Sequence, residues 1–308
     1  MTQKSKNWLW VILGVVATLG MVSVYLFYLN RQTIVPVSWG NVAGTRNSFV
    51  DWLNTFQQSL VTPVATAVLG ILIVRRHPQN QIGRLLLIIA FLNSLLMFVG
   101  EWSVYGYFTA SVAVPGRAWA AWVANWIWIV LFAALLYLVG VFPTGQFISR
   151  RWRRVLVGML LWFAVPFLIA SSIEQELSSA YLISNPLPIT APPVVYETLF
   201  TIGLPSMPVI AIILVISAVV RFRRGQGQER QQMKWLLAGV SLMAFMVVAG
   251  LALSFGAGSV LGDVFVNSAI IGPILGIGVA LLRYRLYDID IIIRRTLVYG
   301  VVSALLAT

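Results

Sequence analysis

Few side chains in this chain could do chemistry, and most of them stand at the ends of apolar segments. There is no cysteine, so disulfides, thiol catalysis and thiolate metal sites are excluded. The single histidine, His77, cannot form an ordinary zinc or di-iron site alone. It stands before Pro78 in a short basic turn, where a solvated loop residue is a simpler interpretation than a phospho-acceptor. We therefore predict no catalytic residues, no metal and no cofactor.

An aromatic cluster beside one carboxylate is the best candidate for ligand binding. Trp119, Trp122 and Trp126 are spaced i, i+3 and i+7, so a helix would present them on one face. Such a face could bind a small apolar or cationic ligand, with Glu101 as the counter-charge. The alternative is an aromatic belt at a membrane interface. The candidate ligand-binding residues are Glu101, Trp102, Trp119, Trp122, Asn125 and Trp126.

Residues 283–295 combine charges of both signs, aromatic side chains and a run of isoleucines. The two aspartates can pair with arginines of the same turn or with basic residues of neighbouring turns. Two alternative pairings would make the segment a two-state relay. The alternative is a solvated turn that only fixes the topology. The candidate relay residues are Arg285, Tyr287, Asp288, Asp290, Arg294 and Arg295.

Small residues at helical spacing form a candidate packing site. Gly272, Gly276 and Ala280 are spaced i, i+4 and i+8, which lets two helix backbones approach closely. The partner helix could belong to the same bundle or to a second copy of the chain. Both packing within one bundle and a homodimer are therefore open.

The elements that must position these residues are membrane-spanning helices. The chain is 59% hydrophobic and 10% charged, whereas soluble domains carry roughly 25% charged residues. Apolar runs long enough to approach or cross a hydrocarbon core of about 30 Å recur along it. We predict an all-α, polytopic membrane bundle of eight complete spans and the start of a ninth. The eight predicted spans are Trp8–Leu29, Ser59–Val74, Leu85–Gly100, Ala118–Phe142, Val155–Ile173, Leu199–Val220, Trp235–Phe255 and Val264–Leu282.

The basic residues alternate with the spans and predict the orientation. If the N-terminus is cytoplasmic, every lysine and arginine except Arg31, Arg46 and Arg117 falls in an inner segment. This is the positive-inside pattern of membrane proteins, and it accounts for the net charge of +12 without nucleic acid. The predicted location is the inner membrane of a bacterium, with the lipid bilayer as partner.

Ionisable residues are absent near the middle of the predicted spans. The polar residues there are amides and hydroxyls, such as Thr62, Thr66, Asn93, Ser94 and Asn267. They could form hydrogen bonds between helices or line a ligand pocket. Pumps and ion-coupled carriers keep ionisable groups at depth, so their absence argues against proton relays but leaves a carrier of a neutral solute open.

Four inner turns carry a resemblance to a known family. Residues 75–83 resemble an R-R-x-P-x-N-x-I-G turn, and residues 142–145 with Arg151 and Trp152 resemble F-P-x-G followed by R-W. Residues 229–235 resemble E-R-x-Q-x-K-W, and residues 284–299 resemble Y-R-L-Y-D-I-D-x-x-I-x-R-T-L-V-Y. Together they are similar to the N-terminal multi-span membrane region of bacterial sensor histidine kinases that carry GAF domains. Arg84 departs from the family, which often has an aromatic residue there.

The resemblance implies a sensory role in two-component signal transduction. Residues 1–282 would be the membrane sensor domain, 283–295 the cytoplasmic relay or linker turn, and 296–308 the start of a further membrane helix, too short to span. The kinase module would follow in cis and act on a response regulator, since the 308 residues contain neither a phospho-acceptor helix nor an ATP-binding core. The alternatives are a small-solute transporter and a non-catalytic membrane scaffold or partner subunit.

The predicted orientation can be tested with reporter fusions. Fusions after Arg154 and after Lys234 should report a cytoplasmic location, and fusions within residues 174–198 an external one, because the basic turns are retained inside. Alkaline phosphatase and green fluorescent protein activities measure the two locations. Exchanged locations at either kind of position would refute the assignment.

Overall fold

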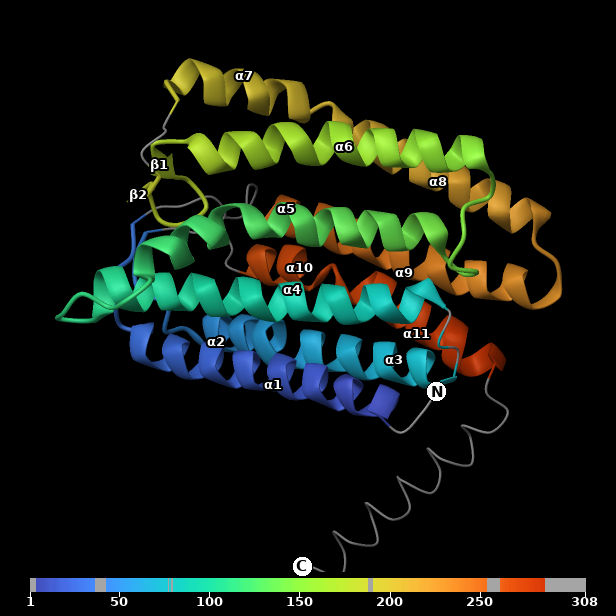
Figure 1. The fold of residues 1–308 in the computed structure, drawn as a ribbon, viewed down its shortest axis with the longest axis horizontal. Coiled ribbons are helices and arrows are strands. Elements are labelled where there is room, and N and C mark those ends of the chain that lie inside the picture. Colours follow the sequence, from blue (N-terminus) through green and yellow to red (C-terminus); the bar gives the residue numbers. More distant parts are fainter. Residues whose placement is uncertain are drawn as a thin grey trace, which may run out of the picture.

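The computed structural model describes residues 4–36, 43–76, 78, 80–187, 191–253 and 261–285. Within these ranges the chain is a bundle of helices lying roughly side by side, with one two-residue hairpin at one end (Figure 1). The helices are α1 (Lys4–Asn30), α2 (Phe49–Phe56), α3 (Thr62–Arg76), α4 (Gln81–Val104), α5 (Arg117–Val141), α6 (Arg150–Ile173), α7 (Pro193–Gly203), α8 (Ser206–Arg224), α9 (Gly227–Leu251), α10 (Leu261–Ser268) and α11 (Ile271–Arg285). The remaining elements are two π-helical turns, η1 (Gln57–Val61) and η2 (Tyr105–Thr109), and the antiparallel strands β1 (Glu176–Leu177) and β2 (Ile183–Ser184).

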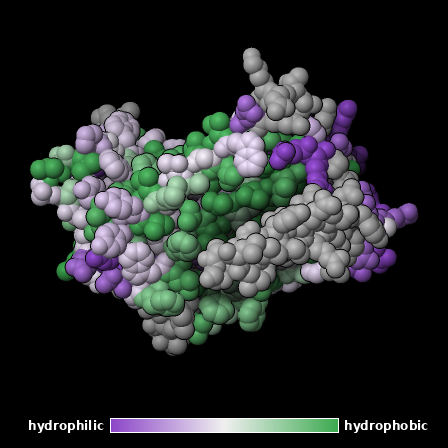
Figure 2. All heavy atoms as spheres, turned by 90° about the horizontal axis from the view of Figure 1, so that it is seen from below, coloured by the Kyte–Doolittle hydropathy of each residue, from purple (hydrophilic) through white to green (hydrophobic). Residues whose placement is uncertain are grey.

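Among the residues that the structure describes, eight helical stretches are long and apolar enough to cross a membrane, and the predominance of helix confirms the predicted all-α class. Hydrophobic residues cover the middle of the face shown in Figure 2, and hydrophilic residues gather toward its two ends. The stretches are Asn7–Asn30, Phe49–Arg76, Gln81–Thr109, Arg117–Val141, Arg150–Ile173, Pro193–Arg224, Gly227–Gly250 and Val264–Leu281.

Several predicted boundaries are wrong, each for a local reason. The apolar run from Ser59 is short for a span unless its helix begins earlier, and the helix does begin earlier, at Phe49, after a capping box formed by Ser48 and Asp51. The π-turn η1 then joins α2 to α3 without a break. The basic turn expected at residues 221–234 is mostly helical, because α8 continues to Arg224 and α9 begins at Gly227, which leaves a turn only at Gly225 and Gln226.

The helices pack in an order that follows the sequence closely, so neighbours in the chain are mostly neighbours in space. α4 packs on α1, α3 and α5, α6 lies between α5 and α7, and α9 packs on α11 (Figure 1). The largest buried cluster joins α3, α4, α5, α9 and α11 around Leu86, Ile89 and Ile277. We call the end that carries β1 and β2 the hairpin end, and the opposite end, where α1 begins and α3 and α8 finish in arginines, the basic end.

Glycine allows the closest helix contacts. A Cβ atom at Gly70 of α3 would lie 2.9 Å from the carbonyl oxygen of Gly83 in α4. Between α9 and α11, Gly239 meets Gly272, and a Cβ atom at Gly276 would lie 2.5 Å from the carbonyl oxygen of Trp235. The glycines of the candidate packing stripe therefore face α9 of the same chain, and Ala280 is fully buried.

Substitution of Gly239 tests this contact. Gly239→Ala should lower the free energy of unfolding by about 1–3 kcal/mol, because the added methyl group would overlap the backbone of Gly272. Gly158→Ala is the matched control, since a Cβ atom there meets nothing within 4 Å. Thermal unfolding of the purified chain in detergent measures both. Equal stability of the two variants would contradict the close approach.

Candidate functional site

A partly buried ion pair is the centre of the hairpin end. The Arg46 guanidinium donates to both carboxylate oxygens of Glu101, at 2.7 and 3.0 Å. Asn30, the last residue of α1, donates its amide to the same carboxylate at 2.8 Å and to the Glu101 carbonyl oxygen at 3.0 Å. The side chains of Arg46 and Glu101 are 17% and 11% exposed. The Glu101 carboxylate of α4 therefore binds both the end of α1 and the segment before α2.

Aromatic rings enclose this ion pair. The Arg46 guanidinium lies over the rings of Phe27 and Tyr181, 5.4 and 5.9 Å from their centroids. Burial acts to lower the pKa of Arg46, but the attraction of Glu101 and the hydrogen bonds to it outweigh burial, so the pKa is raised. Burial also raises the pKa of the Tyr181 hydroxyl. Arg46 is therefore held as a cation, and Tyr181 as a neutral phenol, at any physiological pH.

A second polar cluster lies between α5 and the chain that follows α6. Asn125 donates its amide to the Ser171 carbonyl at 2.7 Å and to the Glu174 carboxylate, and it accepts from the Ser179 backbone N–H at 2.8 Å. The Ser178 N–H also donates to Glu174, at 3.0 Å. Glu174 is only 5% exposed and has no basic partner among these contacts. Burial raises the pKa of its carboxyl above the usual 4.5, against the opposing effect of these hydrogen bonds.

The segment Glu174–Asn185, which we call the cap, connects the two clusters. Its residues Leu177, Ala180 and Ile183 are buried against Ala121 of α5. Tyr181 and Leu182 both have φ of 57°, a left-handed conformation that is unfavourable for residues with side chains. This turn aims the Tyr181 ring at Arg46, while Glu174 binds Asn125 at the other side. The cap thus couples the helix pair α1 and α4 to the pair α5 and α6.

The tryptophans form a ladder along α5. Trp119 and Trp122 are in edge contact at 5.9 Å, and Trp122 and Trp126 at 5.4 Å, so the predicted common face is present. Trp122 donates its indole N–H to the Ser172 carbonyl at 3.2 Å. Trp119 is 55% exposed, whereas the indole nitrogen of Trp126 is buried without a hydrogen-bond partner. The ladder therefore runs from the surface into the bundle.

The structure distributes the six candidate ligand-binding residues over three environments. Glu101 belongs to the ion pair, and Trp102 lies between α4 and α5, where it stacks on Phe98 and donates to the Pro115 carbonyl. Trp122, Trp126 and Asn125 contact α6 or the cap, and Trp119 extends the ladder to the surface. A cationic ligand using Glu101 as its counter-charge would have to displace Arg46.

Sequence reasoning missed the partners that complete this end of the bundle. Arg46 was considered only as one of three basic residues outside the inner turns. Asn30, Glu174 and Tyr181 lie between the predicted spans, where the sequence predicts no specific contact. The usable signal was that Arg46 falls outside the pattern of basic residues that the sequence predicts for the cytoplasmic segments.

At the basic end, residues of the family-like turns have structural roles. The Asn80 side chain caps α4 by accepting from the Ile82 N–H at 2.8 Å. Gly145 has φ of 77° and lies against Asn80. Arg221 donates to the carbonyls of Gly140, Phe142 and Gln146 at 2.7–2.9 Å. The start of α4, the turn at residues 142–146 and the end of α8 are thereby joined into one unit.

Hydrogen bonds between amides and hydroxyls join the helices between these two ends. The hydroxyl oxygens of Ser23 and Ser59 lie 3.2 Å apart, and the Asn93 amide donates to the backbone carbonyl of Gln58 at 2.8 Å. The Ser268 hydroxyl donates to the side-chain oxygen of Gln57 at 2.7 Å. In the part of the chain that the structure describes, no group of three or more histidine, aspartate or glutamate side chains could hold a metal ion.

Comparison of the chain with protein-family models, with curated proteins and with solved structures found no match. The similarity of the inner turns to sensor kinases is therefore carried by the quoted motifs alone. Among the candidate relay residues, Arg285 ends α11, and Tyr287, Asp288, Asp290, Arg294 and Arg295 lie outside the described residues, as does His77.

Removal of one partner of the ion pair should destabilise the chain. Arg46→Gln is expected to lower the free energy of unfolding by about 3 kcal/mol, because it leaves the Glu101 carboxylate buried without its counter-charge. Arg31 precedes Arg46 in the same loop and lies over the Tyr28 ring of α1. Arg31→Gln should therefore change the free energy of unfolding little. The double variant Arg46→Gln with Glu101→Gln should recover part of the loss. Intrinsic tryptophan fluorescence during unfolding in detergent measures all three, and equal losses in the two arginine variants would contradict the pair.

The raised pKa of Glu174 predicts a pH dependence. A carboxyl with a raised pKa in the folded state contributes its full stabilisation below its ordinary pKa of 4.5 and loses it as pH rises through the raised value. The wild-type thermal midpoint should therefore fall over that interval, and Glu174→Gln should flatten the profile. Glu176→Gln, an exposed neighbour, is the control. A wild-type profile that does not change over this interval would contradict the assignment.

Proposed function

We propose that this chain is the membrane-embedded sensory input region of a bacterial two-component signalling protein, and that the hairpin end receives the stimulus. The observation that supports this most directly is the coupling of two buried charged groups by one small cap. Glu101 is held by Arg46, Glu174 is held by Asn125, and the cap touches both. The positive-inside pattern puts this end on the envelope side.

The cap offers two ways to convert a stimulus into a change of helix contacts. A cationic ligand could compete with Arg46 for Glu101, beside the aromatic rings that already bind a guanidinium. A change of pH would alter the charge of Glu174 and so the bond to Asn125. Either event loosens one helix pair from the other while the remaining contacts stay in place. A two-state element biased by a local charge change is the requirement for a switch.

The basic end would pass the change on. Arg221 and the turn at residues 140–146 link α8 to α5, and Asn80 and Gly145 link that turn to α4. A shift of α4 or α5 would be passed through the shared core to α11, which ends at Arg285, the first of the candidate relay residues. In this proposal the N-terminus is cytoplasmic, the protein sits in the inner membrane, and a C-terminal kinase module acts on a response regulator.

The complete gene product in inverted membrane vesicles tests the proposal. Phosphate transfer from labelled ATP to the protein should be measurable, and Asp288→Asn with Asp290→Asn should change its basal rate without altering insertion or abundance. Arg46→Gln should change the rate in the same assay, whereas Arg31→Gln should not. The absence of phosphorylation, together with uptake of a neutral solute by the same vesicles, would replace the sensor with a carrier.

A further inference from the structure

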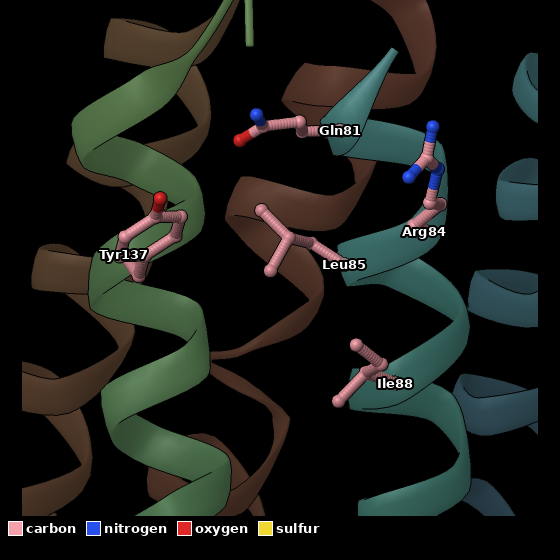
Figure 3. Close-up of a pocket in the computed structure, with 5 residues that line it drawn as sticks. All are labelled: Gln81, Arg84, Leu85, Ile88 and Tyr137. Atoms are coloured by element: carbon pink, nitrogen blue, oxygen red, sulfur yellow. The ribbon is translucent and has the colours of Figure 1, made fainter. Parts of the chain in front are cut away.

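A groove between α4 and α5 lies at the basic end, far from the cap. Its volume is about 400 Å³, and it is lined by Gln81, Arg84, Leu85 and Ile88 of α4 and by Tyr137 of α5 (Figure 3). Neither the ion pair nor the tryptophan ladder contributes to it. Arg84 is also the residue at which the chain departs from the sensor-kinase turn. The groove therefore has no role in the function proposed above.

The lining divides into a polar end and an apolar end. Gln81 and Arg84 stand in the first turn of α4, and the Tyr137 hydroxyl points toward that end of the groove (Figure 3). Leu85 and Ile88 continue along the helix away from it, and Ile88 is 50% exposed. The rise of an α-helix separates Arg84 from Ile88 by about 6 Å along the axis. Hydrogen-bond donors and an apolar wall thus follow one another along the direction that crosses the bilayer.

The polar residues of the groove are held in place. Arg84 donates to the Pro78 carbonyl at 2.9 Å, and the Tyr137 ring makes an edge contact with Phe147 at 5.4 Å. The surroundings are positive, since Arg75 and Arg76 end the neighbouring helix α3. Of the acidic side chains that the structure describes, only Glu229 lies at this end of the bundle, at the start of α9. The groove therefore favours an anion at its polar end.

The geometry points to a binding site for an anionic glycerophospholipid of the leaflet at the basic end. The phosphate would bind the Arg84 guanidinium, and one acyl chain would cover Leu85 and Ile88. A soluble anion would use the donors but leave the apolar wall uncovered, and a neutral lipid would use the wall but not the charge. The inference requires the helices to lie in a bilayer, and it does not depend on a sensory role.

Photolabelling in vesicles tests the site. The purified chain is placed in phosphatidylcholine vesicles that contain phosphatidylglycerol with a photoactivatable acyl chain, and labelled peptides are mapped by mass spectrometry. Labels should concentrate on the first turns of α4 and the facing part of α5. Arg84→Gln should reduce this labelling about fivefold, which is the effect of one basic residue near an anionic surface. Arg84→Lys should retain most of it.

Matched variants distinguish lipid binding in the groove from the general attraction of anionic lipids to basic residues at this end. Arg76→Gln removes a charge from the same end but outside the groove, so labelling should persist. Ile88→Trp keeps every charge and fills the apolar end, so labelling should fall. Excess inorganic phosphate should not displace the label. Equal losses in the Arg84→Gln and Arg76→Gln variants, equal labelling by a phosphatidylcholine probe, or displacement by phosphate would each overturn the proposal, and helicity measured by circular dichroism shows that the variants remain folded.

Discussion

The ion pair between Arg46 and Glu101 is the interaction on which the hairpin end depends. The Glu101 carboxylate near the end of α4 is neutralised by a guanidinium from a distant segment, which lies over the rings of Phe27 and Tyr181. Asn30 then fixes the end of α1 to the same oxygen atoms. The cap places the Tyr181 ring beside Arg46 and against Val35 and Val104. The long separation in sequence between these partners makes the arrangement a product of the tertiary fold.

The bundle itself follows from composition and periodicity. Runs of apolar residues without charges had to become helices, because lipid offers no partner for backbone N–H and C=O groups. The number and order of the long helices could therefore be predicted. Their ends could not, since these depend on local details such as the capping box at Ser48 and on π-turns that carry a helix past its apolar run.

The candidate site was less predictable than the fold for a related reason. Helical spacing correctly placed three tryptophans on one face of α5. Spacing within a helix contains no information on which residue of another segment meets that face. Glu101 was recognised as unusual, but its partner lies in a loop whose path depends on many weak contacts. Asn125 was included as a pocket residue, whereas in the structure all its side-chain contacts are with the Ser171 carbonyl and the cap.

The glycine contact between α9 and α11 has a mechanical consequence. Where Gly239 meets Gly272, no side chain separates the two backbones, so there is no soft layer that could absorb a sliding or tilting motion. We therefore expect α9 and α11 to move together as one rigid unit. The Ser268 hydroxyl bonds the Gln57 side chain just before α11 begins, and Arg285 is the last residue of α11. A displacement of the π-turn η1 would therefore be transmitted along α9 and α11 to Arg285.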